Sequence, residues 1–428
     1  MRLLLISDYA QTGFGRVGRE LMRRFTDAGL DTRAIAINWR GREGEAQALI
    51  EKEASGDAVK ALLDQMDNDD LVPRMVPAGL NRNDGMGLQM TMPACTGQLW
   101  PSWTPDRVLV VADARAMLHR LAQDGGVLGQ VPTWNYVPIE GRMLPPFLSA
   151  IWEKVTPVAM SAFGQTEIAK LMGRDVAMIP HGVSTTFFPV SPTTPGRYRD
   201  QVITSKDQAK AAFGWQGRKV LLRTDRFVPR KDYPGLFRSL GPVLMANPDT
   251  LLVIHCAAQD EGGLMAELIS HVPGSFVRDG MWQHPQIRLT KAHDTYRGLS
   301  DGDLNVLYNA ADIYVSPTMA EGFGLCLAEA AAVGVPVVTT DYAAGPEVLG
   351  AGGVLIPPRD YFINVYAHEW ALIDEAAFAT QVQYLLDHPA RARAIGAAGL
   401  RHVSQFSWDA AASQFLDLFG AEAMPVAA

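Results

Sequence analysis

The sequence predicts an α/β protein made of two doubly wound domains, each with a parallel sheet covered by helices on both sides. In both halves of the chain, short apolar runs alternate with amphipathic segments. This alternation is typical of parallel strands joined by crossover helices. The alternation stops and restarts once, which indicates two domains. A chain of 428 residues is also longer than a single hydrophobic core usually supports. A ligand cleft is expected between the domains, at the carboxyl ends of their strands.

The first domain is expected over residues 1–185. Its strands are predicted where the chain reads RLLLIS, TRAIAIN, RVLVVAD, PTWNYVPI and TPVAMS. The segment GRVGRELMRRFTDAG has helical periodicity and ends at Gly29. From about residue 40 to 105 no such pattern is present, so an irregular insertion is predicted there, with an exposed loop at 82–98.

The second domain is expected over residues 186–405. A stretch rich in Pro, Thr and Ser, residues 181–200, indicates a linker at its start. Further strands are predicted at KVLLRT, TLLVIHCA, IRLTKA, ADIYVSP, VPVVTT and GVLIPP. The last segment, 406–428, is predicted to form an amphipathic helix that packs back towards the first domain. Its apolar side chains are Phe406, Phe415, Leu416, Leu418 and Phe419.

Composition excludes several classes of protein. Hydrophobic residues make up 48% of the chain and charged residues 20%, which fits a soluble globular protein rather than a disordered one. A net charge of −8 gives no global attraction to nucleic acid or to an acidic membrane. Cys95, Cys256 and Cys326 lack metal-ligand spacing, so a reduced cytoplasmic protein without a metal is expected. No apolar run has the length of a membrane span or the form of a signal peptide.

The stretch EGFGLCLAE, from Glu321 to Glu329, has the strongest functional signal. A helix is expected to start near Gly324, and the free N–H groups and dipole of its first turn would attract an anion. Glycines at 322 and 324 let the backbone approach a ligand closely. Glu329 lies a little more than one turn into the helix, so both carboxylates can face one ligand and accept hydrogen bonds from sugar or ribose hydroxyls. The alternative is a solvated helix with two surface glutamates.

The glycine loop TGFGRVG follows the first predicted strand and contains Gly13, Gly15 and Gly18. It matches the dinucleotide fingerprint, but the next strand ends in Asn38 rather than in an acidic residue, so a nicotinamide site is not expected. The favoured interpretation is a loop that faces the cleft, near a donor phosphate or the acceptor. The alternative is a tight strand-to-helix turn.

Arg226 and Lys231 lie in LLRTDRFVPRKD, at the end of the first strand of the second domain. Two cations across the cleft from an anion-binding helix could clamp a diphosphate, because Arg binds phosphate oxygens bidentately and Lys acts as a mobile charge. The neighbouring Arg223 and Arg230 leave a solvated basic loop as the alternative.

Two carboxylates follow strands on the acceptor side of the predicted cleft. Glu140, in PIEG, could orient or deprotonate an acceptor hydroxyl, or it could be a simple loop carboxylate. Asp113 has a similar position after a strand, but the argument for a role at the acceptor is weaker for it than for Glu140. Among the histidines, His181 is assigned to the shape of the interdomain hinge, His119 is expected to be packed, and His293 is expected in a surface loop.

Together these segments resemble the retaining nucleotide-sugar glycosyltransferases of the GT-B fold, the glycosyl transferases of group 1, whose two domains are Rossmann-like. The resemblance rests on TGFGRVG, IPHGVSTTFFP, DRFVPRKD, LYNAADIYVSPTMAEGFGLCLAEAAAVGVPVVTT, AAGPEVLGAGGVLIPP and FSWDAAA. It implies that Glu321 contacts the donor sugar, that Glu329 holds the ribose, and that Arg226 and Lys231 neutralise the leaving diphosphate. It also implies donor contacts from the glycine loop and from the backbone of the EGFG loop, through Gly13, Gly15, Gly322, Phe323, Gly324 and Leu325.

The resemblance also implies the type of donor and suggests an acceptor. It implies a nucleoside diphosphate sugar, with UDP-sugar as the expected form, and no other cofactor. The family commonly has a histidine where this chain has PIEG, so Glu140 would replace it. The region 40–105 and PIEG look similar to phage-encoded members, which would place the protein in the host cytoplasm and suggest a hydroxymethylated DNA base as acceptor. Arg16, with Arg19, Arg23 and Arg24, would then bind acceptor phosphates.

Three alternatives remain at this point. The acceptor could be lipid-linked, a polysaccharide or a small molecule rather than DNA. The chain could be a nucleotide-sugar-binding module without catalysis, although such a module would be expected to lose the anion-binding and glutamate positions. An epimerase of related fold would need a different set of acids and histidines.

Overall fold

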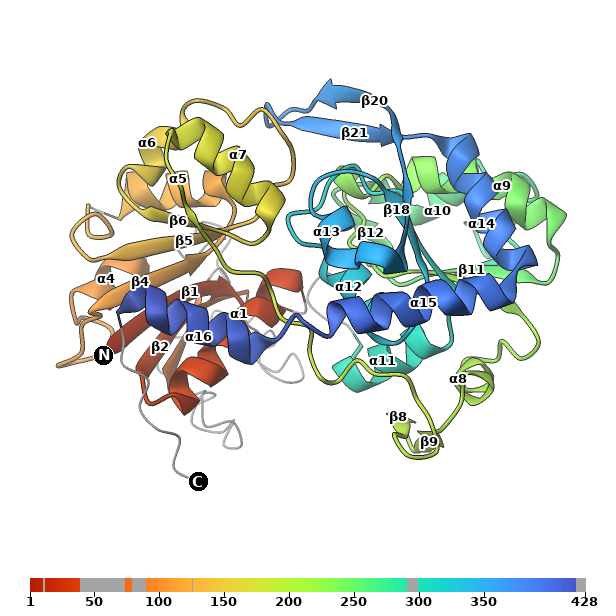
Figure 1. Ribbon diagram of the computed structural model, residues 1–428, viewed down its shortest axis with the longest axis horizontal. Helices are drawn as coiled ribbons and strands as arrows, with labels where there is room; N and C mark the ends of the chain where they lie inside the picture. Colours follow the sequence, from red (N-terminus) through yellow and green to blue (C-terminus); the bar gives the residue numbers. More distant parts are fainter. Residues whose placement is uncertain (11, 39–73, 79–89, 125, 291–298, 421–428) are drawn as a thin grey trace.

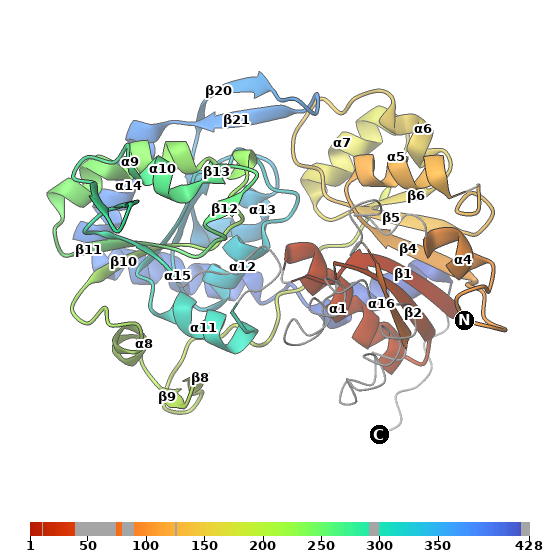
Figure 2. The ribbon, with the colours of Figure 1, turned by 180° about the vertical axis from the view of Figure 1, so that it is seen from behind.

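The computed structural model describes residues 1–10, 12–38, 74–78, 90–124, 126–290 and 299–420. They form two α/β domains that lie side by side, with the first turn of the first helix at their boundary (Figures 1 and 2). Both domains contain a parallel sheet between helices, as the alternation of apolar and amphipathic segments predicted. The α/β fold class with two doubly wound domains is therefore confirmed.

The amino-terminal domain contains a sheet in the order β3-β2-β1-β4-β5-β6-β7. Each described neighbour pair in this sheet runs parallel, so every connection must cross over the sheet, and the carboxyl ends of the strands meet at one edge. The elements are β1 (Arg2–Asp8), α1 (Gly13–Asp27), β2 (Asp31–Ile37), β3 (Met75–Ala78), α4 (Thr91–Cys95), β4 (Arg107–Val111), α5 (Ala114–Gln123), β5 (Thr133–Val137), α6 (Leu148–Trp152), β6 (Thr156–Ala159), α7 (Ala162–Met172) and β7 (Ala177–Met178).

The carboxy-terminal domain contains a second parallel sheet in the order β16-β11-β10-β17-β18-β19, together with small antiparallel hairpins. Its elements up to β16 are β8 (Gly196–Tyr198), β9 (Gln201–Ile203), α8 (Lys206–Ala212), β10 (Lys219–Arg223), η4 (Pro229–Lys231), α9 (Tyr233–Ala246), β11 (Thr250–Ile254), β12 (Gln259–Asp260), β13 (Gly263–Leu264), α10 (Met265–Ile269), β14 (Phe276–Arg278), β15 (Met281–Gln283) and β16 (Ile287–Leu289).

The rest of this domain begins with the helix that precedes the EGFG loop. These elements are α11 (Asp301–Asn309), β17 (Ile313–Ser316), α12 (Leu325–Ala332), β18 (Val337–Thr340), α13 (Gly345–Leu349), η5 (Gly350–Gly352), β19 (Gly353–Ile356), β20 (Pro358–Ile363), β21 (Glu369–Ile373), α14 (Glu375–Asp387), α15 (Pro389–Val403) and α16 (Trp408–Phe419). Strands β11, β17 and β18 are buried along their whole length, which explains their continuous apolar runs.

Part of the segment predicted to be an irregular insertion has regular structure. Strand β3 extends the amino-terminal sheet, and the short helix α4 lies within the stretch expected to be an exposed loop. Thr91, Ala94 and Cys95 on α4 are buried, so the expectation of an exposed loop is wrong for these residues. Residues 39–73 and 79–89 lie outside the described part of the chain.

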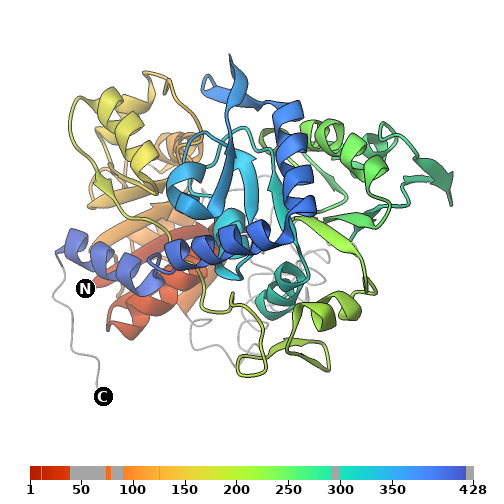
Figure 3. The ribbon, with the colours of Figure 1, turned by 45° about the vertical axis from the view of Figure 1, so that its right-hand side comes forward.

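The last helix joins the two domains. Helices α15 and α16 run end to end across one side of the molecule, and α16 lies over the amino-terminal domain (Figure 3). Phe415 packs edge-on against Phe25 of α1 at 6.0 Å, and Phe419 lies 4.8 Å from Trp134 of β5, both measured between ring centroids. These fully or almost fully buried rings attach the carboxy-terminal segment to the first domain.

Candidate active site

A cavity of about 340 Å³ lies between the two domains. Its walls come from the end of β1 and the start of α1, from the loop after β5, from the loop between β10 and α9, and from the EGFG loop with α12. These are the carboxyl ends of strands in both sheets, where parallel α/β folds place their ligands. The cavity brings together most of the residues that the sequence singled out.

The EGFG loop leads into helix α12, as predicted. Gly324 precedes the helix with φ 94°, a backbone conformation that favours glycine. In the described part of the chain no side chain caps this helix end. The Leu327 amide donates to the Gly324 carbonyl at 3.0 Å, so the Leu325 and Cys326 amides are the ones available to an anion. Gly322, Phe323, Gly324 and Leu325 all line the cavity.

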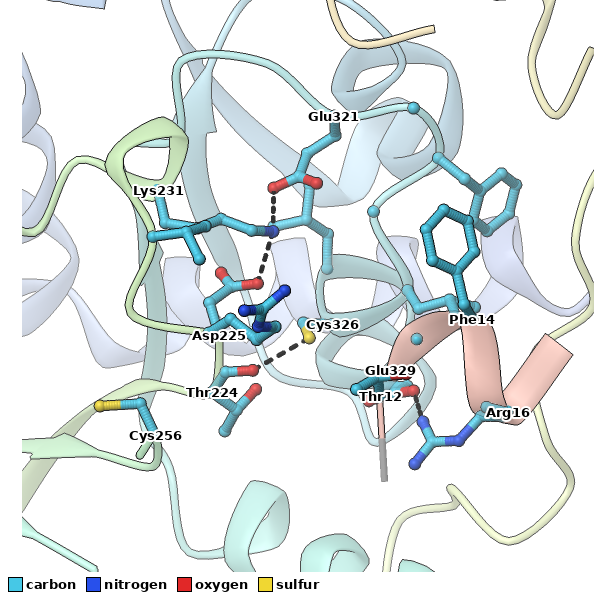
Figure 4. Close-up of a pocket in the computed structure, with 18 of the residues that line it drawn as sticks. Thr12, Phe14, Arg16, Thr224, Asp225, Lys231, Cys256, Glu321, Cys326 and Glu329 are labelled. Atoms are coloured by element: carbon cyan, nitrogen blue, oxygen red, sulfur yellow. Dashed lines mark hydrogen bonds and ion pairs between the residues drawn. The ribbon is translucent and has the colours of Figure 1, made fainter. Parts of the chain in front are cut away.

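Lys231 lies between two buried carboxylates. Its Nζ is 2.6 Å from Oε1 of Glu321 and 2.6 Å from Oδ1 of Asp225, as Figure 4 shows. Burial alone would lower the pKa of Lys231, but Asp225 and Glu321 raise it above its ordinary value. Burial would raise the pKa of Asp225, but Lys231 and Arg223 lower it to about 2. Burial would also raise the pKa of Glu321, but Lys231 and Arg230 lower it below its ordinary value, so the ammonium and both carboxylates are charged at neutral pH.

Arg230 connects this cluster to the other domain. Its guanidinium is 2.9 Å from Oε2 of Glu321 and 2.7 Å from Oε1 of Glu140 in the amino-terminal domain. Burial raises the pKa of Glu140, and Arg230 opposes that shift. Glu140 thus reaches the cleft as predicted, held by a cation of the opposite domain.

Arg226 lines the same cavity and is half-exposed. It forms a two-pronged ion pair with Asp260, at 2.8 and 3.0 Å, and a further contact of 3.1 Å with Glu261. The basic loop is therefore not simply solvated: Arg223 and Lys231 are buried, and each cation has an acidic or carbonyl partner.

Glu329 faces the cavity from within α12. Its Oε2 accepts a hydrogen bond of 2.8 Å from Tyr308, whose hydroxyl also lies 2.7 Å from the Thr224 hydroxyl. Its other oxygen pairs with Arg16, which also binds Asp301 at 2.7 Å. Arg16 was predicted on the acceptor side. The first turn of α1 brings it against Glu329 of the opposite domain, which was predicted on the donor side (Figure 4).

The glycine loop has two parts with different surroundings. Gly13 lines the cavity, and a Cβ built on it would lie 3.7 Å from Leu325 of α12. Gly15 is not among the lining residues, and a Cβ there would lie only 1.9 Å from the Ala10 carbonyl oxygen. Gly15 therefore permits a close packing of α1 on the preceding turn, which is the alternative interpretation of the motif.

Asp113 does not line the cavity. It caps helix α5 by accepting a hydrogen bond of 2.8 Å from the Ala116 amide, so its placement beside the acceptor is not supported. Two further arginines of α1 proposed as a phosphate-binding face are also occupied: Arg19 donates to the Tyr9 and Ala10 carbonyls, and Arg24 pairs with Glu20 and Asp409. Arg23 is exposed.

His181 packs at the junction of the domains. Its ring contacts Phe323 and Trp408, and its Nδ1 lies 2.7 Å from the Tyr136 hydroxyl. Burial lowers the pKa of His181 to about 3. The neutral ring supports the predicted structural role. His119, expected to be packed, is exposed, and His293 lies outside the described residues.

Acidification should destabilise the protein through His181. A histidine whose pKa falls from 6.5 to about 3 on folding stabilises the protein fully above pH 6.5, and this contribution is lost as the pH falls towards 3. Between pH 7.5 and 5 the loss should be about 2 kcal/mol. Urea unfolding at both pH values checks this. His181→Phe should remove most of that loss, whereas His119→Phe, at an exposed site, should not.

Asp225, Arg230 and Tyr308 are site residues that sequence reasoning missed. Asp225 and Arg230 lie within DRFVPRK itself, so their position beside Arg226 and Lys231 was the available signal. Tyr308 gave no such signal, because a tyrosine in an apolar helix is typical of a core.

In the described part of the chain no three His, Cys, Asp or Glu side chains gather in a metal-ligand arrangement. No described helix is long and apolar enough to span a membrane.

Comparison with known proteins gives one family match and several relatives. Residues 277–388 match the family model described as Glycosyl transferases group 1. The O-antigen chain mannosyltransferase B of Escherichia coli is 29% identical over 49% of this chain and 47% of its own length. The GDP-mannose-dependent alpha-(1-6)-phosphatidylinositol monomannoside mannosyltransferase of Mycolicibacterium smegmatis is 27% identical over 68% of this chain and 70% of its own length. The chain thus spans about half the length of the E. coli relative.

Solved structures match almost the whole chain. A sucrose-phosphate synthase from Thermosynechococcus elongatus superposes with a TM-score of 0.68 at 17% identity, over 98% of each chain. The Anabaena protein HepE, in complex with UDP and glucose, gives a TM-score of 0.64 at 14% identity, over 98% of this chain and 99% of its own. At such identities these matches establish the fold, which is the GT-B arrangement of two Rossmann-like domains around a cleft.

Proposed function

We propose that the protein is a glycosyltransferase that moves a sugar from a nucleoside diphosphate donor to an acceptor hydroxyl. The observation that supports this most is the grouping of Lys231, Arg226 and the uncapped amino-terminal end of α12 in one interdomain cavity. Cations and a helix N-terminus around one space suit a diphosphate, whose negative charge grows as it departs. Buried carboxylates in the same space suit the hydroxyls of the sugar and ribose.

The residues then have separate roles. Glu321 accepts hydrogen bonds from the donor sugar, and Lys231 holds Glu321 while neutralising the diphosphate. Arg226 binds the diphosphate by exchanging part of its pairing with Asp260 and Glu261. Glu329 binds the ribose hydroxyls, and Arg16 holds that carboxylate from the other domain.

We further propose that the anomeric configuration is retained. The bond between the anomeric carbon and the diphosphate oxygen breaks while the acceptor oxygen bonds on the same face. The acceptor proton passes to a departing phosphate oxygen or to Glu140. Glu321 is a poor nucleophile because Lys231 and Arg230 both bind its carboxylate, which favours this route over a covalent intermediate. Proton NMR of the product's anomeric centre tests retention.

The donor and acceptor are proposed by class. HepE binds UDP and glucose, and the M. smegmatis relative is named for GDP-mannose, so both UDP- and GDP-sugars are candidates. That relative is also named for a phosphatidylinositol monomannoside acceptor, and the E. coli relative for an O-antigen chain. A lipid-linked or polysaccharide acceptor is therefore favoured. The hydroxymethylated DNA base is disfavoured, since Arg16, Arg19 and Arg24 already have partners within the protein.

A cytoplasmic setting suits the three free cysteines, because thiols stay reduced there. The non-catalytic alternative is weakened because the described structure retains the glutamates, the cations and the helix end together in one cavity.

A two-stage experiment tests the proposed function. A thermal-shift screen with UDP, GDP, UDP-glucose and GDP-mannose should raise the melting temperature with at least one nucleotide and its sugar, since a ligand of the native state stabilises it. Labelled donor should then pass to one of three acceptors: phosphatidylinositol vesicles, methyl α-mannoside or hydroxymethylated DNA. The proposal fails if no nucleotide binds and no label is transferred to any acceptor or to water.

A further inference from the structure

The hairpin formed by β20 and β21 reaches from the carboxy-terminal domain to the amino-terminal one. In Figures 1 and 2 it spans the space above the boundary between the domains. Residues 142 and 369 form an isolated antiparallel bridge between the domains, in which the Glu369 amide donates to the Arg142 carbonyl at 3.0 Å. No pattern in the sequence indicated this contact.

Side chains strengthen the same bridge. Nε of Arg142 is 2.6 Å from Oε1 of Glu369. The hydroxyl of Tyr342 accepts a hydrogen bond of 3.1 Å from the Arg142 amide and lies 2.8 Å from the Glu369 carbonyl oxygen, to which it donates. The Arg142 guanidinium also lies over the rings of Tyr342 and Tyr361, at 5.2 and 4.7 Å from their centroids. One arginine of the first domain, still 41% exposed, therefore contacts three side chains of the second.

The bridge is adjacent to Glu140. Only Gly141 separates Glu140 from Arg142, and a Cβ built on Gly141 would lie 2.4 Å from the Glu369 carbonyl oxygen. A larger residue would push the hairpin and the loop apart. On its other side, the Glu140 carboxylate is bound by Arg230 at 2.7 Å. The Glu140 loop is thus fixed to the carboxy-terminal domain at two points, one at the donor site and one at the hairpin.

A second contact supports the hairpin in this position. Arg115 of the first domain donates a hydrogen bond of 3.0 Å to the Tyr366 carbonyl at the hairpin tip, and its guanidinium lies 5.3 Å from the Tyr366 ring centroid. The hairpin therefore contacts the amino-terminal domain at two places near its tip, Arg115 with Tyr366 and Arg142 with Glu369. Such a strap limits how far the Glu140 loop moves when the domains open and close.

We propose that Glu369 is a positioning residue that, through Arg142, holds the Glu140 carboxylate at the place where the acceptor hydroxyl must approach the donor. This inference rests on the proposed function, and it assigns the hairpin to the acceptor side of the reaction. Donor binding depends on the cavity between the glycine loop and α12, and the hairpin is not among the residues that line it. Loss of Glu369 should therefore impair transfer to the acceptor without impairing donor binding.

The test compares Glu369→Ala, Glu369→Gln and the control Glu375→Ala. Glu375 forms an Arg–Glu pair of similar length with Arg238, but within the carboxy-terminal domain alone. Using the donor and acceptor that the wild type turns over best, Glu369→Ala should lower the ratio of transfer to donor hydrolysis by about 10- to 100-fold, the range expected when a catalytic group is misplaced by an ångström. The donor KM should stay within about twofold. Glu369→Gln, which still accepts a hydrogen bond from Arg142, should lose less, and Glu375→Ala should resemble the wild type.

Hydrogen exchange provides a readout that needs no acceptor. In Glu369→Ala the peptide that covers residues 138–142 should exchange faster than in the wild type or in Glu375→Ala, because the bridge to Arg142 is weakened. Unchanged exchange there, or an unchanged ratio of transfer to hydrolysis in a folded Glu369→Ala, would overturn the inference while leaving the proposed function intact. A wild type that neither binds nucleotide nor turns over any donor would overturn the proposed function itself.

Discussion

Lys231→Ala is expected to reduce the rate of sugar transfer by about 10²- to 10³-fold, which is the usual effect of removing one preorganised electrostatic donor from an active site. The wild-type ammonium is buried, charged and 2.6 Å from both Asp225 and Glu321. Without it, the leaving diphosphate loses a cation, and Glu321 loses the partner that fixes its orientation. Steady-state transfer with a labelled nucleotide sugar measures the loss in kcat.

The fold must be controlled in this experiment, because the substitution leaves two buried carboxylates with less compensation. Breaking a buried ion pair in this way commonly costs about 3–5 kcal/mol of stability. The double variant Asp225→Asn with Lys231→Met removes one charge of each sign and should unfold closer to the wild-type temperature. It should still lack transfer. Near wild-type turnover in either folded variant would remove Lys231 from the proposed mechanism.

The fold could be predicted from the sequence because its signals are local. Continuous apolar runs mark β11, β17 and β18 as strands buried on both faces, and Thr12, the first residue of the glycine loop, caps α1. The EGFG loop could also be predicted from the sequence, since glycine before an apolar helix predicts an uncapped helix start. The short helix α4 and the strand β3 could not be predicted in this way. Helix α4 is about one turn long and β3 has four residues, so neither shows a clear periodic pattern, and their burial depends on the rest of the domain.

The sequence predicted more of the site on its donor side than on its acceptor side, where Glu140 lines the cavity but Asp113 does not. Glu321, Lys231 and Glu329 lie in motifs whose spacing predicts that they share one ligand. The ion pairs that connect the two domains join distant parts of the chain. Arg230 binds Glu140, 90 positions away, and Arg16 binds Glu329, more than 300 positions away. Such pairs form only after the two domains meet, and no local pattern records them. For the same reason, the hairpin bridge to Arg142 was not anticipated.

Gly322→Ala should abolish most transfer while leaving donor binding and the fold largely intact. A Cβ at this position would lie 2.4 Å from Cβ and 2.9 Å from Cα of Pro138, in the opposite domain. Contacts this short cannot persist, so the two domains must separate by roughly an ångström, a misplacement that can cost about 10²-fold in rate. The residues of the donor site on the carboxy-terminal domain keep their own contacts. Transfer assays combined with nucleotide titration separate the two effects.

The control for this prediction is Gly302→Ala in α11, where the nearest atom to the added Cβ would be 3.9 Å away and no clash arises. It should transfer sugar at the wild-type rate. Because the Gly322 clash lies between domains rather than within one core, each domain can relax as a rigid body, and the melting temperature should change little. If Gly322→Ala instead transfers normally, the closed arrangement of the cleft is not the one in which transfer occurs. If it loses nucleotide binding as well, the glycine acts on the donor directly rather than by letting the domains approach.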